Sequence, residues 1–208
     1  MTEAPVVFVV DDDPSVRSSL KFLLSTVGLE AETFNSADSF LRKKPADVPS
    51  CLVLDVRLPG LSGLDFQREL AARNIRLPIV FLTGHGDIPM SVRAIKAGAV
   101  EFLTKPFRDQ DLLDAVRIAL EQDRARREQE KEVTEIQRRF DSLTSREQEV
   151  ISMVVTGMLN KQIADQLGTA ESTVKVQRSR AMEKMKAESV IDLVRMIEKL
   201  NTPSEKAS

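Results

Sequence analysis

Short runs of β-branched and apolar residues alternate with helical segments in the first 120 residues of this chain. Five such runs, VVFVV, EAETF, CLVLD, IVFLT and VEFLT, occupy residues 6–10, 30–34, 51–55, 79–83 and 100–104. Strands that alternate with helices form a parallel sheet with helices packed on both faces. The alternation therefore predicts one α/β domain with a five-stranded, doubly wound parallel sheet.

The segments between these runs carry the start and stop residues of helices. We predict helices over 14–27, 36–43, 63–73 and 88–98, and one that begins near Asp109. Pro14 suits a first helical turn, Ser36 can cap a helix start, and Gly98 suits a helix end.

Polar residues follow four of the five predicted strands. They are Asp11, Asp12 and Asp13 after the first strand, Asp55 at the end of the third, Thr83 at the end of the fourth and Lys105 after the fifth. In doubly wound sheets, ligands bind at the carboxyl ends of the strands. We therefore expect these side chains to share one edge of the sheet.

The residue types at this edge match a phosphoryl-transfer site. Neighbouring carboxylates repel one another, and a cation held by Asp11, Asp12 and Asp55 would relieve that repulsion. Few carboxylates with hard oxygen ligands suit Mg2+. A carboxylate such as Asp55 can also accept a phosphoryl group. A hydroxyl at Thr83 and an ammonium at Lys105 would bind the remaining phosphoryl oxygens.

The chain changes character after residue 120. The stretch EQDRARREQEKEVTEIQRRFDS is almost wholly charged, and its apolar residues Val133, Ile136 and Phe140 recur at spacings of three and four. This spacing predicts a helical linker with one narrow apolar stripe. Two interpretations stay open, a solvated helix and a short coiled coil between two copies of the chain.

The last 60 residues carry residues typical of helix starts and ends, and they show no strand pattern. We predict helices over 145–156, 160–167, 170–185 and 189–200, with Thr144 and Glu147 as a capping box and Gly157 and Gly168 as stops. A short helix, a tight turn and a second helix form a helix-turn-helix. Residues 171–186 hold five basic and two acidic side chains. An outward basic helix of this kind suits the major groove of DNA.

Four stretches give the first part of the chain a specific resemblance. VVDDDPSVR, LVLDVRLPGLSGLDF, PIVFLTGHGD and AIKAGAVEFLTKPF resemble the receiver domain of two-component response regulators, over residues 5 to 122. The resemblance implies a flavodoxin-like sheet of order 2-1-3-4-5. It also implies that Asp55 accepts a phosphoryl group from a phosphohistidine on a sensor histidine kinase. The expected Mg2+ ligands are Asp11, Asp12, Asp55 and the backbone carbonyl of Arg57.

The same resemblance implies roles for further residues. Thr83 and Lys105 would bind the phosphoryl oxygens, and the Lys105–Pro106 peptide bond would be cis. Phe102 lies where the family keeps an aromatic switch residue, which turns inward when Thr83 moves. Asp13 would cap the following helix. Arg57 and His85 lie two places beyond Asp55 and Thr83, and we hypothesise that they tune the access of water to the phosphoryl group.

The last part of the chain resembles the LuxR-type helix-turn-helix, through LTSREQEV and GMLNKQIADQLGTAESTVKVQRSRAMEKM. The whole chain thus resembles FixJ-type response regulators of transcription, with a receiver domain over 1–122, a charged helical linker over 123–140 and the DNA-binding domain over 141–203. The resemblance implies contacts with bases or the groove wall from Lys175, Val176, Gln177 and Ser179. It implies phosphate contacts from Lys161, Thr173 and Arg178.

The partners expected from these resemblances are a cognate histidine kinase, promoter DNA, RNA polymerase and a second copy of the chain. Phosphorylation would favour a homodimer through the face that carries Phe102. The last helix, 189–200, is the usual dimer contact of the family, and its apolar residues are Val190, Leu193, Val194, Ile197 and Leu200. These residues could equally be internal core.

Two other functions compete with this interpretation. A haloacid-dehalogenase-like phosphatase would use Asp11 as nucleophile in a D-x-D motif, but Ser15 stands where that motif has Thr or Val. A receiver domain with an output that binds protein or RNA is the second alternative. As a response regulator, the chain would accept a phosphoryl group and dephosphorylate itself without being a turnover enzyme.

The composition of the chain indicates the cellular compartment in which we expect the protein. The single cysteine, Cys51, excludes an internal disulfide framework and fits a small core residue. The first residues lack the basic and apolar regions of a signal peptide, and no apolar stretch approaches the length of a membrane span. We therefore expect a cytoplasmic protein without a membrane partner. The formal charge of −2 gives no sign of nucleic-acid binding by the chain as a whole.

Overall fold

A five-stranded parallel sheet lies at the centre of the first of two units. The structure is a computed structural model that describes residues 4–43, 47–84 and 88–201. The first unit extends to Arg127, and the second unit begins at Glu128. The strands are β1 Val6–Val10, β2 Glu30–Phe34, β3 Ser50–Asp55, β4 Ile79–Thr83 and β5 Glu101–Thr104. They pair in the order β2-β1-β3-β4-β5, which confirms the predicted order.

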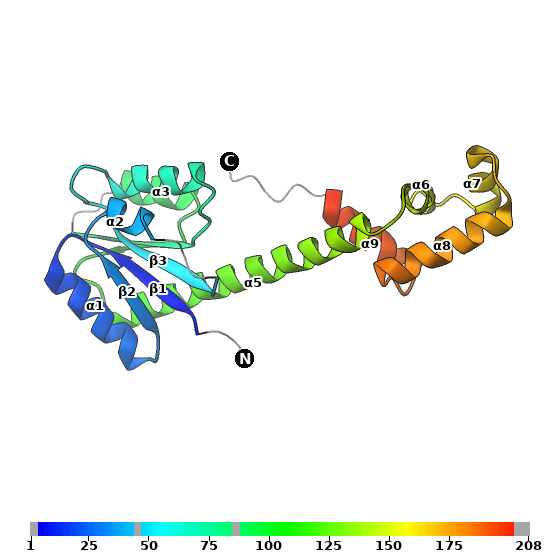
Figure 1. Cartoon of the computed structure of the whole chain (residues 1–208). Coiled ribbons are helices and arrows are strands. Elements are labelled where there is room, and N and C mark those ends of the chain that lie inside the picture. Colours follow the sequence, from blue (N-terminus) through cyan, green and yellow to red (C-terminus); the bar gives the residue numbers. More distant parts are fainter. Residues whose placement is uncertain (1–3, 44–46, 85–87, 202–208) are drawn as a thin grey trace. The chain divides into compact units, whose positions relative to one another are not determined.

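Helices cover both faces of this sheet (Figure 1). They are α1 Pro14–Thr26, α2 Ala37–Leu41, α3 Gly63–Ala72, α4 Ile88–Lys96 and the first part of α5 Asp109–Asp141. Residues of α1 and α5 pack with one apolar cluster, around Val9 and Val53. Residues of α2, α3 and α4 pack with the other, around Phe8 and Phe81. Each strand therefore contributes alternate side chains to two separate cores, as expected for a doubly wound sheet.

The strand register places the predicted polar residues at one edge. Val10 pairs with Leu54, so Asp11 and Asp55 are the next residues on neighbouring strands. Asp55 pairs with Leu82, directly before Thr83. Thr83 pairs with Thr104, directly before Lys105. Four strand ends therefore meet where the sequence predicts a site.

A buried carboxylate fixes α5 to the opposite end of the sheet. The Asp123 side chain is fully buried. Its Oδ2 accepts the Ser50 backbone N–H at 2.9 Å and the Arg127 guanidinium at 2.6 Å. The charge pattern of the sequence places Asp123 in the linker, but in the structure this residue is buried within the first unit. The predicted linker boundaries stay a prediction.

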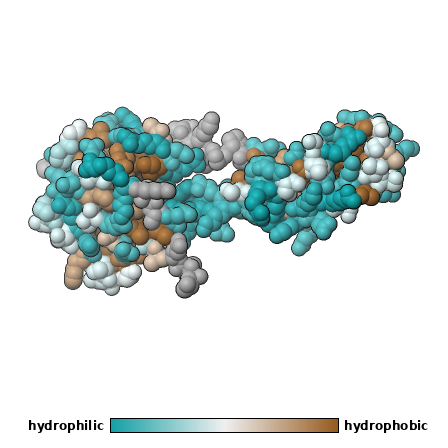
Figure 2. Space-filling model, in the orientation of Figure 1, coloured by the Kyte–Doolittle hydropathy of each residue, from teal (hydrophilic) through white to brown (hydrophobic). Residues whose placement is uncertain are grey.

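Four further helices build the second unit together with the last part of α5. They are α6 Ser145–Val154, α7 Asn160–Leu167, α8 Glu171–Met185 and α9 Val190–Asn201. Ile136 of α5 is buried in their core, and Phe140 packs against it. Two of the three residues of the apolar stripe of α5 are thus occupied within the unit, which leaves less apolar surface for a coiled coil. Figure 2 shows a largely hydrophilic surface along the exposed length of α5.

Cys51 is buried on β3, which confirms its prediction as a core residue. Across the three described ranges, no helix combines the length and the apolar character required to span a bilayer.

Gly63 brings the start of α3 against the end of β3. Its N–H donates to the Val56 carbonyl at 2.8 Å. A Cβ at this position would lie 2.7 Å from the Asp55 carbonyl oxygen and 2.9 Å from the α-carbon of Val56. Two of the nearest atoms belong to the backbone, so only glycine fits, and this explains the last residue of the GLSG stretch.

Gly63→Ala is therefore expected to destabilise the first unit. Overpacking against backbone costs about 1–3 kcal/mol, which would lower the free energy of unfolding in denaturant titrations. Gly84→Ala is the control, because a Cβ there meets no atom within 4 Å. Equal stabilities of the two variants would contradict the close approach.

Candidate functional site

Three carboxylates converge at the carboxyl edge of the sheet. Ligand oxygens of Asp11, Asp12 and Asp55 lie within 4.8 Å of one another. Asp11 and Asp55 are buried and Asp12 is exposed. Oxygen ligands on opposite sides of a Mg2+ ion lie about 4 Å apart. Small side-chain movements would therefore bring all three carboxylates onto one ion, and the hard oxygen donors fit this cation.

Lys105 holds two of these carboxylates together. Its Nζ lies 2.8 Å from Asp11 Oδ2 and 2.7 Å from Asp55 Oδ2. Burial opposes the charge on this ammonium, but the bonds to the two aspartates outweigh it and raise the Lys105 pKa. Lys105 therefore stays charged and offsets part of the repulsion between the carboxylates.

Burial disfavours the ionised form of the Asp11 carboxyl group. Burial raises the pKa of its carboxyl group, and the hydrogen bond from Lys105 offsets this only in part. The Asp11 Oδ1 also accepts the Asp13 N–H at 2.9 Å. A cation at the site would stabilise the ionised form of this buried group, because the positive charge favours ionisation.

Asp13 has a different function from its two neighbours. Its side chain caps α1, and Oδ1 accepts the Ser15 N–H at 2.7 Å. This bond lowers the Asp13 pKa. The prediction that Asp13 serves the helix is confirmed.

Three backbone features support the site from the loops after β3 and β5. The Arg57 N–H donates to Asp55 Oδ1 at 2.8 Å, which orients the carboxylate. The Lys105–Pro106 peptide bond is cis, as the resemblance implies. The Lys105 N–H donates to the Thr83 carbonyl at 2.7 Å, and this bond ties the loop to the end of β4.

Thr83 and Phe102 lie on neighbouring strands. Thr83 is fully buried at the end of β4. Phe102 on β5 is half-buried, and its ring centroid lies 6.2 Å from that of Phe81. His85 lies outside the residues that the structure describes.

Arg17 is a residue of this site that the sequence reasoning missed. Its guanidinium Nη1 donates to the backbone carbonyls of Asp11, at 2.7 Å, and Asp12, at 2.9 Å. Its place in the first turn of α1, directly behind the acidic turn, is the signal that could have identified it.

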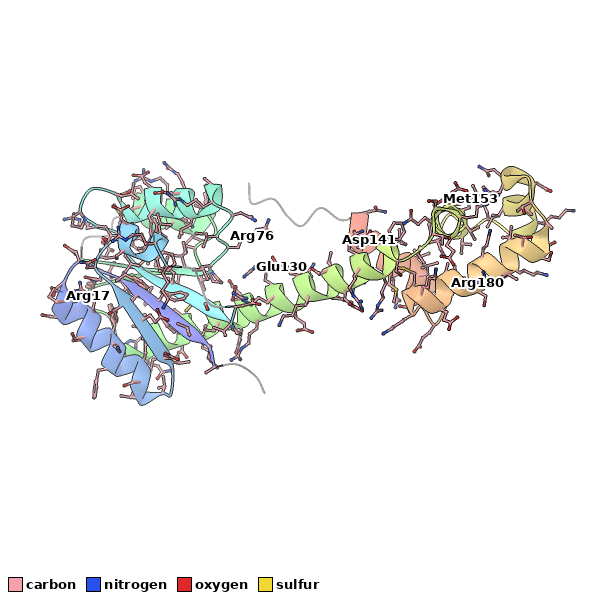
Figure 3. The ribbon with its side chains drawn as sticks, viewed as in Figure 1. Arg17, Arg76, Glu130, Asp141, Met153 and Arg180 are labelled. Carbon is pink, nitrogen blue, oxygen red and sulfur yellow. The ribbon has the colours of Figure 1, made fainter. Side chains whose placement is uncertain are left out.

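A second candidate site lies on α8. Lys175, Val176 and Ser179 are exposed, as are Thr173 and, on α7, Lys161. Figure 3 labels Arg180, another exposed residue of this helix. The basic, exposed surface matches the expected DNA-reading helix.

Two of the α8 residues expected to contact DNA are half-buried. Arg178 is half-buried and donates to Asn160 Oδ1 at 2.9 Å, which links α8 to the start of α7. Gln177 is half-buried, and its Oε1 is buried without a hydrogen-bond partner among the described residues.

The turn before α8 has the geometry of a helix-turn-helix. Gly168 ends α7 with φ 62° and ψ 41°, the left-handed conformation that glycine adopts readily. The Arg146 guanidinium donates to the Leu167 carbonyl at 2.8 Å, which ties this turn to α6.

An ion pair between buried Glu147 and exposed Lys184 links α6 to α8. Glu147 forms the predicted capping box with Thr144. Its Oε2 also lies 2.6 Å from Lys184 Nζ, and the Glu147 side chain is only 6% exposed. The bonds from Lys184 and from the Thr144 backbone lower the Glu147 pKa.

The apolar residues of α9 belong mainly to the core. Leu193 is buried, and Val190, Ile197 and Leu200 pack against the same cluster. The internal-core interpretation of these residues therefore accounts for most of this helix.

Comparisons with known proteins match each part of the chain to a family. The model of the response regulator receiver domain matches residues 7–117. The model of the bacterial regulatory proteins of the luxR family matches residues 141–197.

Full-length relatives share this organisation. Nodulation protein W of Bradyrhizobium diazoefficiens is 58% identical over 94% of this chain and 86% of its own length. Transcriptional regulatory protein FixJ of Rhizobium meliloti is 42% identical over 91% of this chain and 93% of its own length. The solved structure of the response regulator StyR is 49% identical, with a TM-score of 0.85, and covers 94% of this chain and 99% of its own. The chain therefore belongs to the two-component response regulators of transcription that combine a receiver domain with a LuxR-type DNA-binding domain.

Proposed function

We propose that Asp55 is the phosphoryl acceptor and that its phosphorylation controls DNA binding through α8. The observation that carries this proposal is the cluster at the carboxyl edge of the sheet. There, the Lys105 ammonium contacts Asp11 and Asp55 at 2.8 and 2.7 Å. A nucleophilic carboxylate, two further carboxylates and a fixed cation are the parts that phosphoryl transfer requires.

The transfer step follows from these groups. A carboxylate oxygen of Asp55 attacks the phosphorus of a phosphohistidine on the sensor kinase. An O–P bond forms as the N–P bond breaks, and the imidazole nitrogen retains the electron pair and takes up a proton. Lys105 and the Thr83 hydroxyl bind the phosphoryl oxygens and stabilise their negative charge.

The metal ligands proposed from this chain are the carboxylates of Asp11, Asp12 and Asp55 and the carbonyl of Arg57. When bound, Mg2+ would neutralise charge on the phosphoryl oxygens. The chain itself contributes three carboxylates held close together, with ligand oxygens within 4.8 Å of one another. A second contribution is the Arg57 N–H, which orients Asp55 at 2.8 Å.

The signal leaves the site through Thr83 and Phe102. Thr83 is drawn toward the phosphoryl group and vacates space at the end of β4. Phe102, half-buried on the neighbouring strand, turns into that space and changes the surface of α4, β5 and α5. Phosphorylation then shifts the population of two conformations. The second conformation favours a homodimer through this face, and the dimer contacts RNA polymerase at the promoter.

Loss of the phosphoryl group reverses the signal. Water attacks the phosphorus, inorganic phosphate leaves and the Asp55 carboxylate is restored. Arg57, exposed beside Asp55, and His85 limit the access of this water. This autodephosphorylation sets the lifetime of the active form. We place the protein in the cytoplasm, where the kinase domain and the promoter are accessible.

DNA recognition uses the exposed surface of α8 and the start of α7. Lys175, Val176, Gln177 and Ser179 face bases or the groove wall, and Lys161, Thr173 and Arg178 contact phosphates. Arg178 and Gln177 are half-buried, so only part of each side chain is accessible for such a contact. Arg178 would have to share its guanidinium between Asn160 and a phosphate.

Asp55→Asn is expected to abolish phosphorylation by acetyl phosphate. The amide oxygen is too weak a nucleophile to form the acyl phosphate. The wild-type protein is expected to gain a phosphoryl group only with Mg2+, as measured by intact-protein mass spectrometry with and without a chelator. Labelling of Asp55→Asn to the wild-type level, with the phosphate on Asp11, would overturn the proposal in favour of the phosphatase.

Arg57→Ala and His85→Ala are expected to speed the loss of the phosphoryl group several-fold, because both side chains restrict water. The measurement is the decay of the phosphorylated protein after removal of acetyl phosphate. Arg68→Ala is the control, because Arg68 is exposed on α3. An unchanged rate of phosphoryl loss in the variant that carries both substitutions would refute the tuning hypothesis.

Lys175→Ala plus Arg178→Ala is expected to weaken DNA binding. Loss of Arg178 removes a phosphate contact, which lowers affinity and flattens the dependence of affinity on salt by about one unit of slope. Loss of Lys175 removes a contact with a base or the groove wall and lowers affinity further. The measurement is an electrophoretic titration at two salt concentrations, on a fragment that the wild-type protein selects from random DNA. Lys131→Ala, in the exposed part of α5, is the matched control. Binding by the double variant at the wild-type level would exclude the α8 surface and favour an output that binds protein or RNA.

A further inference from the structure

The Arg17 side chain contacts backbone carbonyls of the acidic turn. The turn between β1 and α1 contains Asp11 and Asp12, two of the three carboxylates of the site. One guanidinium nitrogen of Arg17 donates to both of their backbone carbonyls, at 2.7 and 2.9 Å. Arg17 itself is half-buried and lies in the first turn of α1, where Figure 3 labels it.

Asp12 depends on this contact more than Asp11 does. Asp11 is buried, its N–H donates to the Phe34 carbonyl at 3.2 Å, and its carboxylate binds Lys105. The Asp12 side chain is exposed. Within residues 4–43, 47–84 and 88–201, no hydrogen bond or ion pair holds its carboxylate. The Arg17 guanidinium holds the Asp12 carbonyl, and the Asp11 carboxylate holds the N–H of the same peptide unit by accepting from Asp13 at 2.9 Å.

We infer that Arg17 is a positioning residue for the acidic site. By holding both carbonyls, it fixes the turn so that the Asp12 carboxylate stays within reach of the other two. The inference rests on the proposed function, because it takes from there the assignment of Asp12 as a ligand of Mg2+.

The charge of Arg17 and its position act on Mg2+ in opposite directions. A guanidinium near the site repels a cation, so removal of this charge alone would strengthen Mg2+ binding. That repulsion is weakened by water and salt. Loss of a group that orients ligands weakens metal binding by about 10- to 100-fold in other sites. The positioning effect is therefore expected to dominate, and Arg17→Gln should weaken Mg2+ binding.

The test measures Mg2+ binding without a phosphodonor. Full-length, 15N-labelled protein is titrated with Mg2+, and the backbone amide signals of Asp12 and Asp13 report saturation. Arg17→Gln is expected to raise the half-saturating Mg2+ concentration at least about tenfold. Lys21→Gln is the matched control, because it removes the same charge from an exposed position one turn further along α1. Its half-saturation should stay within about twofold of the wild-type value, because exposed charges are screened.

Arg17→Lys separates charge from geometry. Lysine keeps the positive charge but replaces the planar fork of donors by a compact ammonium. Partial recovery, between the values of wild type and Arg17→Gln, is expected. If circular dichroism shows that Arg17→Gln does not fold, Arg17→Lys alone decides. Half-saturation in Arg17→Lys equal to that of wild type would then overturn the inference.

Acetyl phosphate labelling separates this inference from the proposed function. Arg17→Gln is expected to need more Mg2+ for half-maximal labelling and to regain much of the wild-type rate at saturation. A wild-type protein that neither binds Mg2+ nor becomes labelled would overturn the proposed function itself. A wild-type protein that does both, with Mg2+ half-saturation in Arg17→Gln unchanged or lower, would overturn only the role of Arg17.

Discussion

The mutual repulsion of carboxylates at one sheet edge is the constraint on which the first unit depends. Adjacent parallel strands lie about 5 Å apart, so acidic residues at their ends are forced together. Lys105 offsets this repulsion by contacting Asp11 and Asp55. The register of β4 and β5 places Lys105 there, beside the buried Thr83. A site held together by charge responds strongly when a phosphoryl group or a cation alters that charge.

The second unit fixes α8 by analogous polar contacts. The buried Glu147 binds Lys184 of α8, and Asn160 of α7 binds Arg178 of the same helix. These contacts hold both ends of the exposed surface that carries Lys175. Charge-assisted bonds have stricter geometry than apolar packing, so they help to define the orientation of α8.

Much of the fold was predictable from the sequence, because the spacing of apolar residues indicates which of them are buried. The predicted strand over 51–55 is observed as Ser50–Asp55, and the predicted helix over 160–167 is observed as Asn160–Leu167. The cluster of Asp11, Asp55 and Lys105 was predictable for a related reason, since parallel strands end at a common edge. Arg17 and Asp123 were not identified, because a charged side chain in a helix has the same sequence pattern whether it is solvated or bound to buried groups.

The sequence by itself determined the order of the elements, the edge where the acidic residues gather and the basic character of α8. These properties follow from local propensity and from the spacing of apolar residues. Only the tertiary structure decided which polar groups meet. It placed Asp123 against Ser50, Arg17 against two carbonyls, and most of the apolar residues of α9 in the core. Such contacts join residues distant in sequence or depend on the exact path of a turn, so their geometry exists only after the chain has packed.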